Sequence, residues 1–176
     1  MKTIFLIILL SSIAQAKDSL EVVGGSLTYH LESSSDGRPM PYDHTLTPDH
    51  ELIDNPLFGL GWVHQTKDDY YWGAKLFGGE NSVGQPMTGL DASFGAVYGG
   101  WFIGVVGGGY VQNNKTFESA GVIPPSIAEF GDTGLVPIIG GEANYRINLW
   151  GNSYLKWNNL LTPMLYNMSL SIGFDL

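Results

Sequence analysis

The chain has 176 residues and a mass of 19.1 kDa, a length typical of one domain with its own core. It carries 17 Asp and Glu against 8 Lys and Arg, which excludes the basic surface that nucleic acid or anionic lipid headgroups require. Cysteine is absent, which excludes disulfides, thiolate metal sites and thiol nucleophiles, whereas glycine, with 24 residues, is unusually frequent.

The first 16 residues predict export. They combine Lys2, an apolar run over residues 4–10 and the small-residue sequence Ala14-Gln15-Ala16, which is the pattern of a secretory signal peptide. The apolar run is too short to span about 30 Å of hydrocarbon. We therefore expect cleavage after Ala16, leaving a single domain over residues 17–176.

The remaining chain alternates apolar and polar residues with the period of two that is typical of β-strands. In the first strand-like segment, Val23, Leu27 and Tyr29 oppose Ser26 and Thr28, so we expect the first three to share one face. Eight segments are strand-like, and the last is the clearest. In chain order they span residues 22–31, 56–65, 71–77, 90–98, 101–111, 135–147, 153–161 and 166–176.

The lengths of the segments and connections predict a transmembrane barrel. Segments of about ten residues cross a bilayer when tilted. Short connections alternate with long ones, as the periplasmic turns and outer loops of outer-membrane barrels do. Only the last outer connection, at residues 162–164, is short. The long connections lie at residues 32–55, 79–89 and 112–134, and the short ones at 66–69, 99–100 and 151–152.

Two alternative folds are open at this point, and the chemistry of the strand faces separates them. A soluble, secreted β-sandwich shows charge on its exposed face. Here the non-apolar face holds mainly Gly, Ser, Thr and Asn, which fits a narrow lumen, and tryptophans cluster near the expected strand ends, as in interfacial girdles. We predict an all-β fold, an eight-stranded antiparallel up-and-down outer-membrane β-barrel. The isolated charges are Lys75, Asp91, Glu142, Arg146 and Lys156, and the tryptophans are Trp62, Trp72, Trp101, Trp150 and Trp157.

Glycine and proline within the expected strands have two interpretations each. Strand glycine is costly, so it indicates either tight barrel curvature, which we favour from the residues, or a lumen left partly empty for a slender ligand such as an acyl chain. Proline cannot donate to the strand ladder, so Pro56, Pro137 and Pro163 mark either strand ends or a lateral opening. Pro137 is the best candidate for an opening.

The candidate chemistry is acyl transfer. His30 lies at the outer end of the first expected strand, and Ser82 follows Glu80 and Asn81 in the second outer loop. A histidine that takes a hydroxyl proton, oriented by a carboxylate or amide, is the minimal apparatus for acyl transfer, although Ser82 in such a turn also fits ordinary turn chemistry.

The first outer loop holds the only other cluster of metal-ligating residue types. His44, Asp49, His50 and Glu51 are present there, but adjacent residues seldom converge on one ion, and a solvated acidic loop is the preferred interpretation. We expect no metal and no cofactor.

Several stretches resemble the PagP family of outer-membrane lipid A palmitoyltransferases. The similarity lies in Leu27-Thr28-Tyr29-His30, in residues 55–62, in residues 71–77 followed by Asn81-Ser82, in residues 135–139 and in Thr162-Pro163. The resemblance implies a barrel that moves an acyl chain from phospholipid to lipid A, with His30 as base, Ser82 as its partner and lipid entry beside Pro56, Pro137 and Pro163. It also implies a glycine-lined lumen that holds the chain. The family's Asp is Asn81 here, with Glu80 beside it.

Two functional classes therefore follow from the sequence. One is a lipid acyltransferase that uses His30, Ser82, Asn81 and Glu80. The other is a non-catalytic barrel with a structural role, or one that binds envelope partners through its acidic outer loops. In both cases we expect outer-membrane phospholipid and lipid A as neighbours, insertion by the barrel-assembly machinery and a monomer.

Overall fold

The computed structural model describes residues 17–30, 52–81, 84–115, 126–163 and 165–176. The signal peptide predicted over residues 1–16 lies outside these ranges. In the described part of the chain, no helix has the length and hydropathy needed to cross a membrane.

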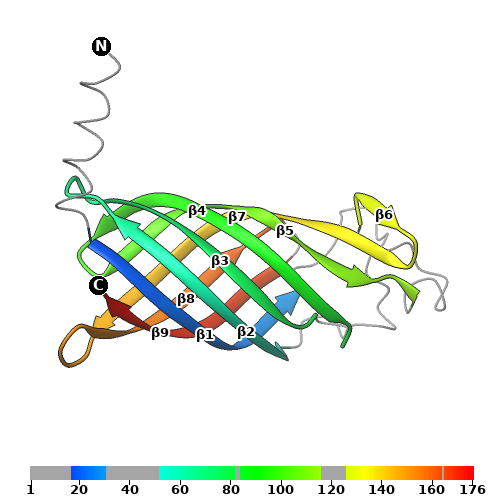
Figure 1. The fold of residues 1–176 in the computed structure, drawn as a ribbon, viewed down its shortest axis with the longest axis horizontal. Helices are drawn as coiled ribbons and strands as arrows, with labels where there is room; N and C mark the ends of the chain where they lie inside the picture. Colours follow the sequence, from blue (N-terminus) through cyan, green and yellow to red (C-terminus); the bar gives the residue numbers. More distant parts are fainter. Residues whose placement is uncertain (1–16, 31–51, 82–83, 116–125, 164) are drawn as a thin grey trace, which may run out of the picture.

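The described strands form one antiparallel sheet that closes on itself (Figure 1). Strands adjacent in the sequence pair with each other, except that β5 pairs with β7 instead of β6, and the pairing of β1 with β9 closes the barrel. Eight strands make up the wall, as predicted, whereas β6 pairs with β7 alone. The strands are β1 (Lys17–His30), β2 (Leu52–Gln65), β3 (Tyr70–Glu80), β4 (Pro86–Tyr98), β5 (Trp101–Asn113), β6 (Ala128–Phe130), β7 (Thr133–Asn148), β8 (Ser153–Leu161) and β9 (Leu165–Asp175).

The two ends of the barrel differ in their connections, which confirms the predicted alternation. Tight turns join β2 to β3, β4 to β5 and β7 to β8, and the first of them is closed by the Thr66 N–H, which donates to the Tyr70 carbonyl over 2.8 Å. Both ends of the barrel sequence lie here, because Ser19 on β1 pairs with Asp175 on β9. We call this the turn end, and the opposite end, where β5 and β7 extend past the other strands (Figure 1), the loop end.

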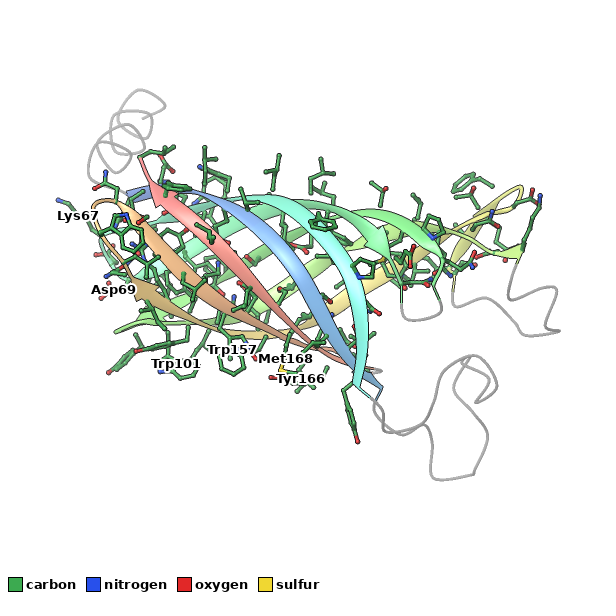
Figure 2. The ribbon with its side chains drawn as sticks, turned by 90° about the horizontal axis from the view of Figure 1, so that it is seen from below. Lys67, Asp69, Trp101, Trp157, Tyr166 and Met168 are labelled. Atoms are coloured by element: carbon green, nitrogen blue, oxygen red, sulfur yellow. The ribbon has the colours of Figure 1, made fainter. Side chains whose placement is uncertain are left out.

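The outer face of the barrel is apolar. Outward-facing side chains such as Phe58, Leu60 and Val105 are more than 60% exposed, and Trp101 and Trp157 point away from the wall (Figure 2). Soluble monomers rarely expose apolar surface on this scale. Ten residue steps separate Trp101 from Val111 along β5, which at about 3.3 Å each and a tilt of about 40° cover roughly 25 Å, the height of a membrane-facing band.

A β-bulge in β1 corrects the predicted faces of the first strand. Gly25 has a φ of 69°, and the register of β1 against both neighbours shifts between Gly24 and Ser26. One extra residue exchanges the two faces of a strand. Val23, 1% exposed, therefore faces the interior together with Thr28, while Leu27 faces outward, although the sequence placed Val23 and Leu27 on one face.

Interior glycines leave space for aromatic side chains. This explanation for glycine within the strands differs from both barrel curvature and a partly empty lumen. A Cβ on Gly95 would lie 2.7 Å from the Tyr71 ring, and one on Gly104 would lie 2.5 Å from the Tyr71 hydroxyl. Tyr71 can therefore pack edge-on against Phe102, with 5.2 Å between ring centroids, and form with Val97 the small hydrophobic core inside the turn end.

The lumen charges are paired rather than isolated. Lys156 donates to Glu21 over 2.6 Å, and Tyr154 donates to the same carboxylate over 2.9 Å. Tyr71 donates to Glu142 over 2.5 Å, and this contact helps to close the lumen in the half nearer the turn end. Glu21 was not predicted to face the lumen, because it precedes the bulge. On that side of the bulge, the residues that face the lumen have the opposite parity from those that follow it.

Candidate functional site

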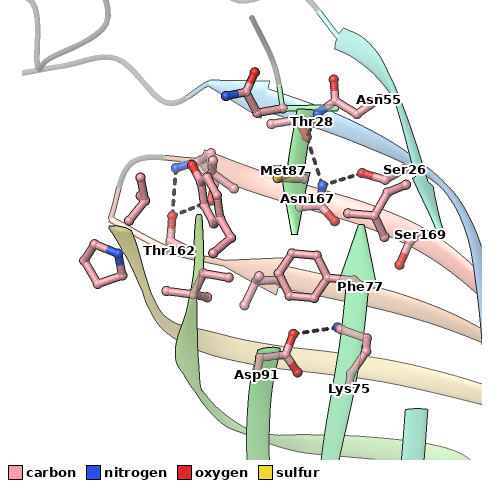
Figure 3. Close-up of a pocket in the computed structure, with 18 of the residues that line it drawn as sticks. Ser26, Thr28, Asn55, Lys75, Phe77, Met87, Asp91, Thr162, Asn167 and Ser169 are labelled. Carbon is pink, nitrogen blue, oxygen red and sulfur yellow. Dashed lines mark hydrogen bonds and ion pairs between the residues drawn. The ribbon is translucent and has the colours of Figure 1, made fainter. Parts of the chain in front are cut away.

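The loop half of the barrel encloses a cavity of about 300 Å³ (Figure 3), at the lower end of the size range of small-molecule sites. On the side of the turn end, the cavity is bounded by the ion pair of Lys75 and Asp91, whose Nζ and Oδ2 atoms are 3.0 Å apart. Residues of all eight wall strands and of the β8–β9 turn line it, so the closed barrel itself creates the space.

One side of the cavity is apolar. Phe77 on β3 and Met87 on β4 line it from one direction, and residues 136–139 of β7 and Leu160 of β8 line it from the other. Phe77 and Val136 are nearly inaccessible to solvent, at 5% and 1% exposed. Such a lining favours an aliphatic ligand, because water gains few hydrogen bonds there.

The barrel wall is interrupted beside this apolar side. β8 ends at Leu161, which pairs with Gly141, whereas β7 continues to Thr133. Among the described residues, the β8-facing edge of residues 136–140 has no strand partner, because β6 pairs only with residues 133–135. We call this interruption the seam gap. Pro137, Thr162 and Pro163 border it and also line the cavity.

The β7–β8 seam is also weak below the seam gap. Its register omits Ala143 and Asn144, where side chains replace the ladder: Asn159 Nδ2 donates to the Ala143 carbonyl over 2.6 Å, and the Asn159 N–H donates to Asn144 Oδ1 over 2.9 Å. Both neighbouring seams, β5–β7 and β8–β9, are continuous. Of these three seams, β7–β8 therefore has the most interrupted backbone ladder, and the cavity reaches the wall there.

The opposite side of the cavity is a polar wall built from β1, β2 and β9. Thr28 Oγ1 accepts hydrogen bonds from Asn55 Nδ2 at 2.7 Å and from Asn167 Nδ2 at 2.9 Å, and Asn167 Nδ2 also donates to Ser26 Oγ at 2.7 Å (Figure 3). Ser26, Thr28 and Asn55 are each at most 4% exposed. We call these four residues the polar wall.

A second cavity of about 60 Å³ lies toward the turn end, and the lining residues that it shares with the first are Lys75, Asp91, Leu160, Asn167 and Ser169. Glu21, Glu142 and Lys156 also border it. The Lys75–Asp91 pair is therefore the floor of the large cavity, and the polar network beneath it separates that cavity from the turn end.

Of the predicted catalytic residues, the structure describes Glu80, Asn81 and the backbone of His30, all at the loop end. His30 is the last residue of β1 and pairs through its backbone with Leu165 of β9. The side chain of His30 and the whole of Ser82 lie outside the described residues. Thr28, two residues before His30, and Asn81, next to Ser82, both line the cavity.

Asn81 has a structural role in the described geometry. Its Nδ2 donates to Gln112 Oε1 over 2.7 Å, linking β3 to β5, and its Oδ1 accepts from the Gln85 N–H over 2.8 Å. Its side chain is 8% exposed. Glu80, the last residue of β3, is exposed and pairs with Pro86. The hydrogen bonds of Asn81 fix the start of the loop that contains Ser82.

The predicted lipid-access prolines divide into two groups. Pro137 and Pro163 border the seam gap. Pro56 is exposed on β2 opposite the β1 bulge and does not line the cavity, although its neighbours Asn55 and Leu57 do.

Within the described ranges, no group of three or more His, Cys, Asp or Glu residues is arranged to hold a metal ion. The candidate ligands weighed from the sequence, His44, Asp49, His50 and Glu51, lie outside those ranges.

The polar wall was not recognised as a site from the sequence. Ser26, Thr28 and Asn167 were placed on the polar faces of their strands, but nothing in the alternation indicates that β1 and β9 would set Thr28 opposite Asn167. The short connection at residues 162–164 was the available signal for the seam gap, because a short loop beside a long one leaves a neighbouring strand without a partner.

No known family model and no curated protein matches the sequence. Solved structures similar to this chain include Ail, the attachment invasion locus protein of Yersinia pestis, with 12% identity and a TM-score of 0.47 over 92% of this chain and 99% of that one. The N-terminal β-barrel domain of Pseudomonas aeruginosa OprF has 16% identity and a TM-score of 0.42, covering 92% and 100%. The outer membrane protein AlkL has 10% identity and a TM-score of 0.40, covering 92% and 90%.

Proposed function

We propose that the protein is an integral outer-membrane barrel that takes the acyl chain of a membrane lipid into its cavity from the side, through the seam gap. The observation that carries this proposal is the coincidence of three features: an apolar cavity side, an interrupted wall and an apolar outer face. An acyl chain that moves from the bilayer core through the seam gap would exchange one apolar environment for another, so its entry has little hydrophobic cost.

The access route follows from where the lumen is closed. Below the floor formed by Lys75 and Asp91, the carboxylates of Glu21 and Glu142 are bonded across the lumen to Lys156 and Tyr71. An apolar chain passing this network would have to displace buried charged groups from their partners, which is expensive. The turn end is therefore closed to the ligand, and the seam gap and the loop end remain.

Acyl transfer is a second candidate, supported by two cavity-lining residues that are near neighbours in sequence of two predicted catalytic residues. Thr28 and Asn81 line the cavity and are near neighbours in sequence of His30 and Ser82. In this version, His30 takes the hydroxyl proton of the acceptor or of Ser82 as that oxygen attacks the ester carbonyl of the chain in the cavity. When the ester C–O bond breaks, His30 returns the proton to the oxygen of the departing lysophospholipid. Lipid A from cells that lack a native palmitoyltransferase would gain one acyl mass when the protein is expressed, and His30→Ala or Ser82→Ala would abolish the gain. Unchanged lipid A, with the barrel folded in the membrane, would favour the non-catalytic class.

Photocrosslinking tests the chain-binding role independently of catalysis. The barrel is placed in nanodiscs that contain a phospholipid with a diazirine at the end of one acyl chain, irradiated and digested. We expect adducts on the cavity residues Phe77, Met87 and Val136 in addition to those on lipid-facing residues.

A matched pair of variants separates cavity from surface. Val136→Trp fills the cavity and should remove the interior adducts, whereas Val105→Trp, on the lipid-facing side of β5, should leave them. Heat-modifiable gel migration checks that both variants fold. Adducts restricted to lipid-facing positions in the unmodified protein would contradict the proposal.

A further inference from the structure

The polar wall has hydrogen-bonding capacity that its own residues do not use. In its three hydrogen bonds the hydroxyls of Ser26 and Thr28 are the acceptors, and the amides of Asn55 and Asn167 are the donors. Each hydroxyl therefore keeps its own proton for another acceptor, and no described residue accepts either one. Both hydroxyls lie on the cavity surface and are at most 4% exposed.

A buried hydroxyl proton without an acceptor is costly, so a ligand in this part of the cavity should provide a hydrogen-bond acceptor for both protons. An oxygen atom held against Ser26 and Thr28 would accept from both. The Asn167 amide holds both hydroxyls and the Asn55 amide also holds that of Thr28, so the wall is arranged before a ligand arrives.

The charge of the cavity restricts the occupant further. Among the described residues that line it, Lys75 and Asp91 are the charged ones, and they form an ion pair with each other at the floor. A carboxylate, phosphate or ammonium group placed on the polar wall would be buried without a counterion, which is strongly unfavourable. An uncharged oxygen avoids this cost.

We propose that the cavity selects an apolar chain that ends in an uncharged, oxygen-bearing group, an ester carbonyl or a hydroxyl, with that oxygen on the polar wall and the chain along Phe77 and Val136. This inference rests on the proposed chain-binding function and adds the chemical class of the ligand to it. A volume of 300 Å³ equals that of about ten water molecules, and thus accommodates a chain of roughly ten carbons. The same chemistry has two sources, the acyl ester of a membrane lipid or a free neutral amphiphile such as a long-chain alcohol.

The test compares three dodecyl compounds that differ only in their headgroups: 1-dodecanol, dodecyl sulfate and dodecyltrimethylammonium. Each is titrated, below its micellar concentration, against the barrel in nanodiscs of ether-linked lipid, which carries no ester carbonyl. Native mass spectrometry measures the bound fraction. We expect dodecanol to bind at least about tenfold more tightly than either ion, since a buried unpaired charge costs more than 1.4 kcal/mol.

Two variants connect the selectivity to the polar wall. Thr28→Val keeps the shape of the side chain and removes the hydroxyl, so it should weaken dodecanol binding about fivefold, the loss of one hydrogen bond, while changing the affinity of the ions little. Asn158→Leu is the matched control, because Asn158 also faces the interior and donates to Ser171 over 2.5 Å, but it borders only the smaller cavity. It should leave dodecanol binding unchanged. Ser26→Ala provides a second loss of a hydroxyl if Thr28→Val fails the gel-migration check for folding.

The outcomes separate the two proposals. Equal affinities for the three headgroups, or full dodecanol affinity in folded Thr28→Val and Ser26→Ala, would overturn the neutral-headgroup inference and leave the chain-binding function standing. Absence of binding by all three compounds would overturn both. Repeating the dodecanol titration in ester-linked lipid identifies the source: competition, seen as weaker dodecanol binding, supports the inference with the lipid ester as occupant, and unchanged binding supports it with a free amphiphile.

Discussion

Breaking the ion pair between Glu21 and Lys156 should cost more stability than any surface change of the same kind. Both side chains are 6% exposed, and the Nζ and Oε1 atoms are 2.6 Å apart. Removing one partner of a buried pair leaves an uncompensated charge and typically costs about 3–5 kcal/mol. Lys156→Met should fall near the lower limit, because Glu21 keeps the hydrogen bond from Tyr154, and Glu21→Gln near the upper limit.

A double-mutant cycle measures the coupling directly. The combined Glu21→Gln, Lys156→Met variant removes both charges, so it should cost less than the sum of the two single changes, with a coupling energy above about 2 kcal/mol. The assay is urea unfolding of the barrel in lipid vesicles, followed by tryptophan fluorescence. The control is Lys115→Met, which breaks the exposed Lys115–Asp132 pair and should cost less than about 1 kcal/mol.

The prediction would be wrong if the losses of unfolding free energy in the two single variants were additive, or if each loss were below about 1 kcal/mol. Either result would mean that water screens the two charges and that the lumen is not closed at this level.

Three further predictions concern the wall and the lumen. The protein should show no steady conductance in planar bilayers, and removing the side chains of Tyr154 and Lys156 together by substitution with Ala should produce one, because these groups close the lumen. Gly95→Ala should destabilise the barrel by about 1–3 kcal/mol in urea unfolding, because a Cβ there would lie 2.6 Å from the Gly104 Cα, whereas Gly107→Ala, with nothing within 4 Å, should change stability by less than about 0.5 kcal/mol. The folded protein should migrate differently on a gel before and after boiling and should require detergent for extraction; a freely soluble mature protein would contradict the membrane assignment.

The strands could be predicted because the pleat assigns each residue to one face, so a chain with an apolar exterior and a narrow polar interior shows its period of two openly. The prediction failed locally at Gly25, where one inserted residue with a positive φ reverses the faces of β1. The local alternation of residues does not reveal the bulge. Without the bulge, Glu21 is assigned to the outer face, whereas it lies in the interior.

The candidate site was predictable only in part, because it depends on long-range register. The sequence identified Pro137 as the best position for an opening, and Pro137 lines the cavity beside the seam gap. The polar wall needs Ser26 opposite Asn55 and Thr28 opposite Asn167, pairings that join residues far apart in the chain. Periodicity along one strand contains no information about which residue of another strand lies beside it.

The most direct test of the account is an NMR measurement of contacts between lipid chains and interior methyl groups. The barrel, deuterated except for its Val, Leu and Ile methyl groups, is placed in nanodiscs of protonated lipid, and nuclear Overhauser effects from chain methylenes are recorded. If lipid chains enter the cavity, we expect effects to the interior methyls of Val136 and Leu160 as well as to those of the outward-facing Val105. Effects to Val105 and other outward-facing methyls alone, with none to Val136 or Leu160, would show that lipid chains do not enter the cavity and would contradict the account.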